Sequence, residues 1–278
     1  MGVANDRIQS CLFPLPFIPS RQGRGKWNFC EGLHYNVIKN AHGFIMVWKV
    51  MMVSLAGGVL CLDRIFPQVM ISRPVVAGPL VGWMLNDPYT GFLCGALIEL
   101  LWIDRLPIGT YIPPNDTITT VIITAAAIIA GGHLGHPSRE LTVFTLLAFL
   151  PLGYAGQQLD IWLIRFNDRS AKNAVSLADR ADVRGIERLH LQALVRSFVL
   201  SAVVIGSAVT AGSWMLIGVF PVLPPFVHKA LTLSYYFIPL LGIAVALTTI
   251  KRKGAISLFC AAFVAMLIIW EWAYGFPR

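Results

Sequence analysis

The chain has 278 residues, of which 56% are hydrophobic and only 13% are charged, and its formal net charge is +8. An ordinary soluble domain carries about 25% charged residues, so this composition excludes that class and indicates an integral membrane protein. The positive residues lie between apolar segments, as they do in the cytoplasmic loops of membrane proteins, which argues against nucleic-acid binding. Because strand-like alternation is absent, we expect an all-α, polytopic helical membrane protein.

Residues 1–44 differ in character from the rest of the chain. The segment CLFPLPFIPS is rich in proline and is followed by the basic run RQGRGKW. Its one apolar run is short and broken by proline, which is not the pattern of a signal peptide. Two interpretations are open: a disordered cytoplasmic arm or, as we favour, a start codon assigned too early, with Met46, Met51 or Met52 as the true first residue. We assign residues 45–278 to a single transmembrane domain.

The first predicted span covers residues 44–62, and two shorter apolar pieces follow it. VVAGPLVGWML (75–85) and TGFLCGALIELLWI (90–103) are separated by the turn signal NDPYT. At 1.5 Å per residue the second piece covers about 21 Å, which is too short to cross a bilayer. We therefore expect a half-helix or a re-entrant arm.

Small residues recur every fourth position on both sides of the NDPYT turn. Gly78 and Gly82 form one pair, and Gly91 and Gly95 form the other. Such patterns let helices in a membrane pack closely. Glu99 follows Gly95 by four residues, so the spacing predicts that Glu99 faces a neighbouring helix and not lipid.

A carboxylate at membrane depth has two interpretations here. An ionised group facing hydrocarbon costs several kcal/mol, so Glu99 should face protein or a water-filled cavity and have a partner. It is either a hydrogen-bond acceptor for a polar substrate, or a residue locked to Arg73 or Arg105 that holds the two short pieces together. Composition alone does not decide between these interpretations.

The second half of the chain repeats this mixture of spans and interruptions. Residues 165–190 are hydrophilic and carry six basic against four acidic residues, so we place them in the cytoplasm as a helical connector. Prolines interrupt the chain again at GVFPVLPPFVHKA. Two interrupted regions suggest two related halves with broken helices, and this pattern is typical of a transporter of a small polar solute. Further spans are expected at 117–130, 141–164, 191–220, 231–250 and 255–274.

Other polar residues are weaker candidates for a site. Gln157 and Asp160 could bind a sugar, but plain solvation at the end of the 141–164 span would also explain them. The histidines stand in loops or alone, and the five cysteines show no CxxC spacing, so we expect neither a metal site nor a nucleophilic catalyst.

A long segment of the chain resembles a known family. RPVVAGPLVGWMLNDPYTGFLCGALIELLWIDRLPIGTYIPPNDTITT, with AGQQLDI and LADRADVRGIERLHLQALVRSF further on, is similar to the membrane subunit IIC of mannose/sorbose-type phosphotransferase systems, over residues 63–253. The resemblance implies a multi-pass permease subunit of the bacterial inner membrane that works, as part of a membrane oligomer, with a sister subunit IID and with cytoplasmic IIA and IIB phosphocarriers. Phosphate in such systems passes from phosphoenolpyruvate through histidines of the soluble proteins, so it implies no catalytic residue and no cofactor in this chain.

The resemblance also indicates site residues. Glu99 matches the glutamate of the family's LELLW motif, and Asn115 falls on the aspartate of its PPD motif, with Asp116 one place later. Because uncharged sugars are bound by carboxylates and amides, often on an aromatic platform, the predicted site for a hexose or amino sugar comprises Glu99, Asn115, Asp116, Gln157 and Asp160, with Trp102 as a stacking surface. Asp104 and Arg105 replace the family's Gly-containing turn, which bears on sugar specificity.

Competing hypotheses remain beside the permease. A secondary transporter would move solute without phosphorylation, driven by a proton on Glu99 or Asp104. A divergent regulatory or scaffold subunit would have lost transport. An intramembrane enzyme is the weakest hypothesis, because no paired nucleophile and base is evident.

Overall fold

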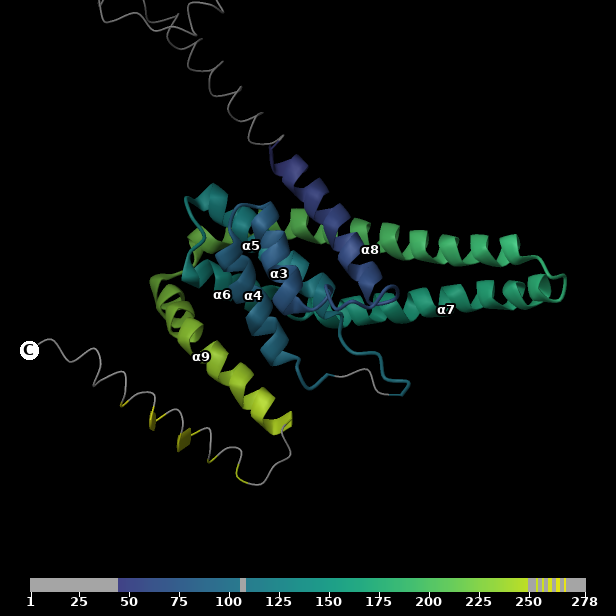
Figure 1. The fold of residues 1–278 in the computed structure, drawn as a ribbon. Helices are drawn as coiled ribbons and strands as arrows, with labels where there is room; N and C mark the ends of the chain where they lie inside the picture. Colours follow the sequence, from purple (N-terminus) through teal and green to yellow (C-terminus); the bar gives the residue numbers. More distant parts are fainter. Residues whose placement is uncertain are drawn as a thin grey trace, which may run out of the picture. The chain divides into compact units, whose positions relative to one another are not determined.

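The computed structural model describes residues 45–105 and 109–249, together with isolated positions between 254 and 268. The chain divides into two compact units, Met1–Lys49 and Val50–Arg278. The predicted extension 1–44 and most of the predicted last span, 255–274, lie outside the described residues. Every regular element in the described part is a helix, which confirms the all-α prediction there (Figure 1).

Four of the described helices are long and apolar enough to cross a membrane: Ile45–Asp63, Asp116–Leu134, Val183–Val222 and Pro225–Thr248. They correspond to the predicted spans 44–62, 117–130, 191–220 and 231–250. Each contains at least 18 residues, and about 20 are needed to cross the hydrocarbon core.

The two short apolar pieces form a tight helical hairpin of α3 (Pro74–Met84) and α4 (Pro88–Leu101). Both helices begin with proline, which suits the first helical position because its missing N–H would be unpaired there anyway. Asp87 caps α4 by accepting hydrogen bonds from the Thr90 backbone N–H at 3.0 Å and from the Thr90 hydroxyl at 2.6 Å. At 11 and 14 residues, both are shorter than a membrane span.

Glycines set the distance between α3 and α4. A Cβ atom added to Gly91 would lie 2.3 Å from the Gly78 carbonyl oxygen, and one added to Gly95 would lie 2.1 Å from the Pro74 carbonyl oxygen. Neither separation is sterically possible. The predicted small-residue contact is therefore present, and it allows the two backbones to touch.

Helix α5 (Asp116–Leu134) is the buried centre of the second unit. Of its most apolar 18-residue window, 83% is buried, and it packs against α3, α4, α6, α7 and α8. The run Ala125–Ala127 presents small side chains that allow neighbouring helices to approach closely. A helix enclosed in this way can hold polar groups at its ends inside protein.

The prediction of one continuous span at 141–164 is wrong. The structure has two helices there, α6 (Arg139–Phe149) and α7 (Leu152–Ala178), separated at Leu150 and Pro151. Pro151 has no N–H to continue the α6 hydrogen-bond ladder, so the chain starts a new helix. With 11 residues α6 is too short to span, and α7 is not among the four helices suited to crossing a membrane.

The predicted hydrophilic connector is a helical hairpin. Its two arms are the second half of α7 and the first part of α8 (Val183–Val219), and these helices lie side by side in Figure 1. Asp182 caps α8 by accepting a 3.0 Å hydrogen bond from the Gly185 N–H. A short 3₁₀ helix, η1 (Phe220–Val222), then leads to α9 (Pro225–Thr249), which packs on α4 and α6.

Candidate polar substrate site

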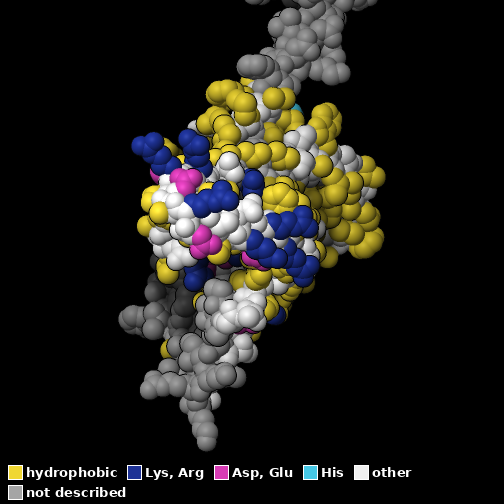
Figure 2. Space-filling model, turned by 90° about the vertical axis from the view of Figure 1, so that its right-hand side faces the viewer, with side chains coloured by type: hydrophobic (Ala, Val, Ile, Leu, Met, Phe, Trp, Pro, Cys, Tyr) yellow, Lys and Arg dark blue, Asp and Glu magenta, His cyan; other side chains and the backbone are white. Residues whose placement is uncertain are grey.

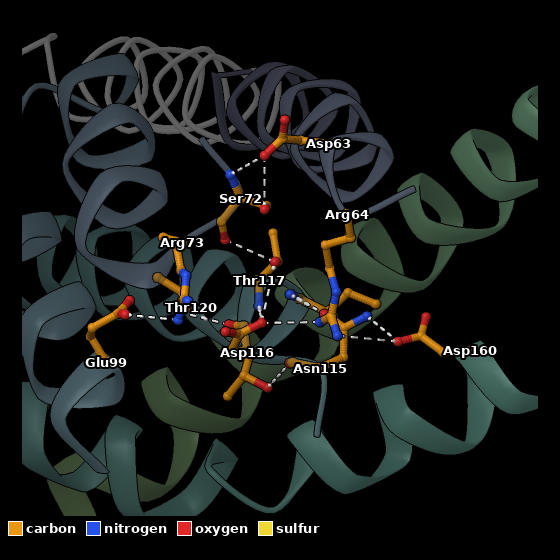
Figure 3. A network of polar contacts seen from close by, with 12 residues as sticks. Asp63, Arg64, Ser72, Arg73, Glu99, Asn115, Asp116, Thr117, Thr120 and Asp160 are labelled. Carbon is orange, nitrogen blue, oxygen red and sulfur yellow. Dashed lines mark hydrogen bonds and ion pairs between the residues drawn. The ribbon is translucent and has the colours of Figure 1, made fainter. Parts of the chain in front are cut away.

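The candidate site is built on the N-terminus of α5 (Figure 3). Asn115 is the N-cap residue, and its Oδ1 accepts a 2.9 Å hydrogen bond from the Ile118 N–H, which would otherwise be unpaired. Its backbone N–H donates to the Gly153 carbonyl at 2.8 Å, and its Nδ2 donates to Asp160 Oδ2 at 2.9 Å. A Cβ added to Gly156 would lie 2.7 Å from the Asn115 Cβ, so glycine is needed for this approach. Asn115 thus fixes the start of α5 against α7.

Asp116 is the first residue of α5 and carries the site's central carboxylate. Its Oδ1 accepts hydrogen bonds from the Thr117 N–H at 2.9 Å and from Arg64 Nη1 at 3.0 Å. The positive end of the α5 dipole stabilises an acid at this position. The helix N-terminus and the guanidinium therefore both interact favourably with this carboxylate.

Arg64 is directed at the site by a folded loop. The adjacent Asp63 is only 1% exposed, and its carboxylate accepts hydrogen bonds from the Val69 N–H (2.8 Å), the Ser72 N–H (3.0 Å) and the Ser72 hydroxyl (2.9 Å). The Thr117 hydroxyl donates to the Ser72 carbonyl at 2.9 Å. These bonds fix the loop onto α5 and so determine where the guanidinium lies.

Helix α7 supplies the remaining polar groups. Asp160 Oδ2 lies 3.9 Å from Arg64 Nη2. Gln157 precedes Asp160 by three residues and therefore lies on the same face of the helix. The Gln157 side-chain amide donates to the Ile112 carbonyl, so it also ties α7 to the segment that enters α5.

The cluster has more acid than base. Arg64 is the only cation in contact with Asp116 and Asp160 among the described residues, so the three groups carry a formal charge of −1. Their side chains are 22%, 27% and 25% exposed, respectively. Within the described part of the chain, no hydrogen bond or ion pair reaches Asp116 Oδ2 or Asp160 Oδ1. Two carboxylate oxygens are thus open to accept hydrogen bonds from hydroxyl groups.

Glu99 belongs to a different ion pair. Its Oε1 lies 3.1 Å from Arg73 Nη1, and its Oε2 accepts a long, 3.5 Å hydrogen bond from the Val75 N–H. Arg105, the other partner considered for Glu99, instead lies beside Asp104, with 3.4 Å between Nε and Oδ1. The ion pair with Arg73 that the sequence suggested is present in the structure; a role of Glu99 as a substrate acceptor stays a prediction. Figure 3 shows Glu99 and Asp160 at opposite sides of the network.

Trp102 packs at the junction of α4 and α7. A Cβ added to Gly153 would lie 2.2 Å from the Trp102 ring, and the Tyr154 ring meets it edge-on with 6.4 Å between centroids. The indole is therefore engaged in helix packing next to the residue that bonds Asn115. The structure assigns it a position beside the cluster and no contact with the cluster's carboxylates.

Three of the six predicted site residues come together in space: Asn115, Asp116 and Asp160. Gln157 lies one turn from them on α7, whereas the other two predicted residues make the separate contacts just described. Among the described residues no group of three or more His, Cys, Asp or Glu side chains could hold a metal ion. The arrangement combines hydrogen-bond acceptors, side-chain amides and one guanidinium, which suits hydrogen bonding to a polar ligand.

The sequence reasoning missed Arg64. The available signal was the pair Asp63–Arg64 directly after an apolar span. Charged residues are common at this position, because spans end at the membrane interface, so the pair did not indicate a site. Only the folded loop shows that Asp63 faces inward and that Arg64 reaches α5.

Four helices of membrane-spanning length, a hairpin of two shorter ones and a partly buried polar cluster define a multi-pass membrane protein with the features of a transporter. Two solved structures share the fold. One, titled "Structure of membrane protein", has a TM-score of 0.62 at 23% identity and covers 80% of this chain and 86% of the other. The cryo-EM structure of the mannose transporter ManYZ with microcin E492 has a TM-score of 0.51 at 22% identity, covering 84% and 88%.

The sequence comparisons give the family. The family described as "PTS system sorbose-specific iic component" matches residues 47–272, and the chain belongs to it. It is thus a IIC permease subunit of a mannose-family sugar phosphotransferase system, a multi-pass protein of the bacterial inner membrane. This confirms the family, function and localisation predicted from the sequence.

Individual relatives differ in the share of this chain to which they can be aligned. The putative N-acetylgalactosamine permease IIC component 2 of Escherichia coli K12 is 49% identical over 59 residues, which are 21% of this chain and 44% of that protein. The sorbose-specific EIIC component of Klebsiella pneumoniae is 25% identical over 73% of this chain and 74% of its own length. The mannose-specific EIIC component of E. coli K12 is 23% identical over 79% and 80%, respectively.

Proposed function

We propose that this subunit forms a translocation path for a hexose or amino sugar together with a IID subunit, and that cytoplasmic IIA and IIB proteins phosphorylate the sugar. The relatives named for mannose, sorbose and N-acetylgalactosamine support this substrate class. The ManYZ structure, which shares the fold, supports a second membrane subunit. The phosphate chemistry belongs to the soluble partners, and this chain supplies binding and passage.

The sugar-binding groups in this proposal are Asn115, Asp116, Gln157 and Asp160. The observation that carries the proposal is the excess of acceptors around one guanidinium: two carboxylates share Arg64, and each keeps one oxygen without a partner among the described residues. A sugar hydroxyl can donate to such an oxygen without breaking the existing ion pair. The amide of Gln157 can add donor capacity if it leaves the Ile112 carbonyl.

In this proposal Glu99 positions the α3–α4 hairpin, and Trp102 bounds the site beside α7. The hairpin is re-entrant, since its helices are too short to span and its glycine contacts keep it closed. A second interruption at η1 supports two related halves with broken helices, as transporters often have around a central site. Access would then alternate by movement of one bundle against the other about the fixed polar cluster.

The test is uptake in vesicles that contain this subunit with IID, IIA, IIB and the phosphate donor system, using labelled mannose, sorbose and N-acetylgalactosamine. Asp116→Asn and Asp160→Asn each keep the side-chain volume but remove a charged acceptor. A hydrogen bond to a charged group contributes about 1.5–3 kcal/mol, so each variant should bind sugar about 10- to 100-fold more weakly while inserting normally.

Asp168→Asn is the matched control, because Asp168 lies on the same helix two turns beyond Asp160 and is exposed. It should transport as the unchanged protein does. Normal uptake by both site variants would refute the assigned site, and accumulation of free, unphosphorylated sugar without the soluble proteins would refute coupling to phosphorylation.

A further inference from the structure

One face of α8 combines arginines with exposed aliphatic side chains. A shallow, open groove there is lined by Arg188, Leu191, Gln192, Val195 and Arg196. At 100° per residue these five positions project from a single face of the helix. None of the lining residues is acidic, so the groove is a positively charged surface with an apolar floor.

The groove lies at the end of the apolar part of α8, where lipid headgroups are expected. From Arg196 to the end of the helix at Val219 the chain contains no charged residue. This stretch rises about 35 Å at 1.5 Å per residue, compared with about 30 Å for the hydrocarbon core of a bilayer. The two arginines therefore lie where the apolar part of α8 meets the interface.

The aliphatic side chains continue from the groove into the apolar part of the helix. Leu191, Val195, Val199 and Val203 recur every fourth residue and are 52%, 59%, 50% and 62% exposed. Residues four apart stand one above the other on a helix. They form an apolar strip that begins between the arginines, advances about 40° around α8 with each step, and runs toward the membrane centre.

The two arginines differ in how they are held. Arg196 Nη1 donates to the Ser170 hydroxyl at 3.2 Å, and its guanidinium lies 5.3 Å from the centre of the Phe166 ring, so α7 fixes its direction. Four of the five N–H donors of this guanidinium are left for another acceptor. Arg188 makes no side-chain hydrogen bond or ion pair with any described residue.

The surrounding charge favours an anionic occupant. Residues 165–190 carry six basic against four acidic side chains, and Lys and Arg side chains gather on the face that Figure 2 shows, which includes the tip of the α7–α8 hairpin. A basic excess of this kind marks the cytoplasmic side. The cytoplasmic leaflet is also the one rich in anionic lipids.

We propose that this groove is a binding site for an anionic phospholipid. The phosphodiester lies between Arg188 and Arg196, with the Gln192 amide as a further donor, and one acyl chain follows the strip from Leu191 to Val203. Guanidinium groups suit phosphate because they present paired N–H donors. The site is separate from the sugar site and would hold the α7–α8 hairpin at the membrane surface.

The experiment measures lipid binding to the purified full-length chain in mild detergent by native mass spectrometry. Phosphatidylglycerol and phosphatidylcholine with identical acyl chains are titrated in parallel. Each interfacial arginine contributes about fivefold to the binding of anionic lipid. Arg188→Gln should therefore weaken phosphatidylglycerol binding about fivefold, and Arg188→Gln with Arg196→Gln about 25-fold.

The control, Arg180→Gln with Arg184→Gln, removes the same charge from the tip of the hairpin and should leave binding almost unchanged. The single variant Arg188→Gln keeps the test decisive if the double variant does not fold, because Arg188 has no side-chain partner within the described residues. Equal losses in the control, or equal binding of phosphatidylcholine, would overturn the proposal. Displacement of the lipid by inorganic phosphate at similar concentration would also overturn it, since the groove would then be a site for free anions.

Discussion

The two acid–arginine contacts near α5 differ in their balance of charge. Glu99 pairs with Arg73, with 3.1 Å between Oε1 and Nη1. This pair is formally neutral, and Glu99 Oε1 is already engaged. Asp116 and Asp160 share Arg64, so their cluster keeps a negative charge and unused oxygens. The sequence places a carboxylate beside apolar segments in both regions. The second region has two carboxylates for one guanidinium, and therefore more acceptor capacity left than the first.

The two contacts also differ in the elements that they join. Glu99 and Arg73 connect α4 to the residue before α3, inside a hairpin already closed by glycine contacts. The Arg64 cluster connects the end of the first described helix with α5 and α7. A movement between these elements would alter the second contact and leave the first intact, as our proposal of a substrate site at the Arg64 cluster requires.

The largest loss of stability is expected for Arg64→Gln. It leaves Asp116 and Asp160 without a counter-ion at 27% and 25% exposure. Breaking a fully buried pair costs about 3–5 kcal/mol, and the cost for this partly buried cluster should approach the lower end of that range. Thermal unfolding in detergent should show this as a clear fall in the midpoint. Arg64→Gln combined with Asp160→Asn restores the charge of −1 and should recover much of the stability without recovering uptake. If the double variant is no more stable than the single one, charge balance is not what holds the cluster.

The next largest loss of stability is expected for Gly91→Val, which tests the close α3–α4 contact of the hairpin that carries Glu99. The new Cβ would meet the Gly78 carbonyl oxygen at 2.3 Å, and overpacking of this kind costs about 1–3 kcal/mol. Gly218→Val is the control, because nothing lies within 4 Å of a Cβ at that helical position. Equal unfolding midpoints for the two variants would contradict the close α3–α4 contact.

A smaller loss of stability, with a large loss of uptake, is expected for Asn115→Ala. The variant removes a helix cap, which costs about 1 kcal/mol, and also the 2.9 Å bond to Asp160. Ser138→Ala removes the comparable cap of α6, where the Ser138 hydroxyl accepts from the Leu141 N–H at 3.1 Å. The Asn115 variant should be destabilised somewhat more, because it also loses the bond to Asp160, and only this variant should fail to bind sugar. Loss of uptake in both would mean that capping alone explains the effect.

The smallest effect is expected for Glu99→Gln. Arg73 is 39% exposed and can be solvated when its partner becomes neutral, so the cost should stay below about 1 kcal/mol. Uptake and membrane insertion should remain close to those of the unchanged protein. Abolished uptake with normal folding would instead make Glu99 the substrate acceptor and reverse the comparison between the two sites.

The helices could be predicted where the length of an apolar segment agrees with the positions of the turn-forming residues that bound it. The four spans, the short pieces around NDPYT and the glycine contact between them are local properties of spacing and turn chemistry. The break at Leu150 and Pro151 was missed, because the apolar residues on either side of it form one hydropathy maximum. A single proline inside such a run can either kink a helix or end it, and packing decides which.

The site could be predicted only in part. A carboxylate or an amide beside an apolar segment is visible in the sequence, and Asp160 was predicted in this way, whereas the resemblance to the family's PPD motif indicated Asn115 and Asp116. Arg64, the common partner of Asp116 and Asp160, lies 52 positions before Asp116, and no spacing rule connects residues so far apart. The same limit applies to Glu99, for which the sequence offered Arg73 and Arg105 as partners and the structure shows Arg73.

The sequence by itself determined that this is a membrane protein, where most of its helices lie and how long they are, and the family to which it belongs. These follow from composition and from contacts between residues near one another along the chain. The tertiary structure alone decided which charges meet, because an ion pair depends on distances of a few ångströms set by the packing of α5, α7 and a folded loop. That pairing gives Glu99 one arginine of its own and leaves Asp116 and Asp160 to share another.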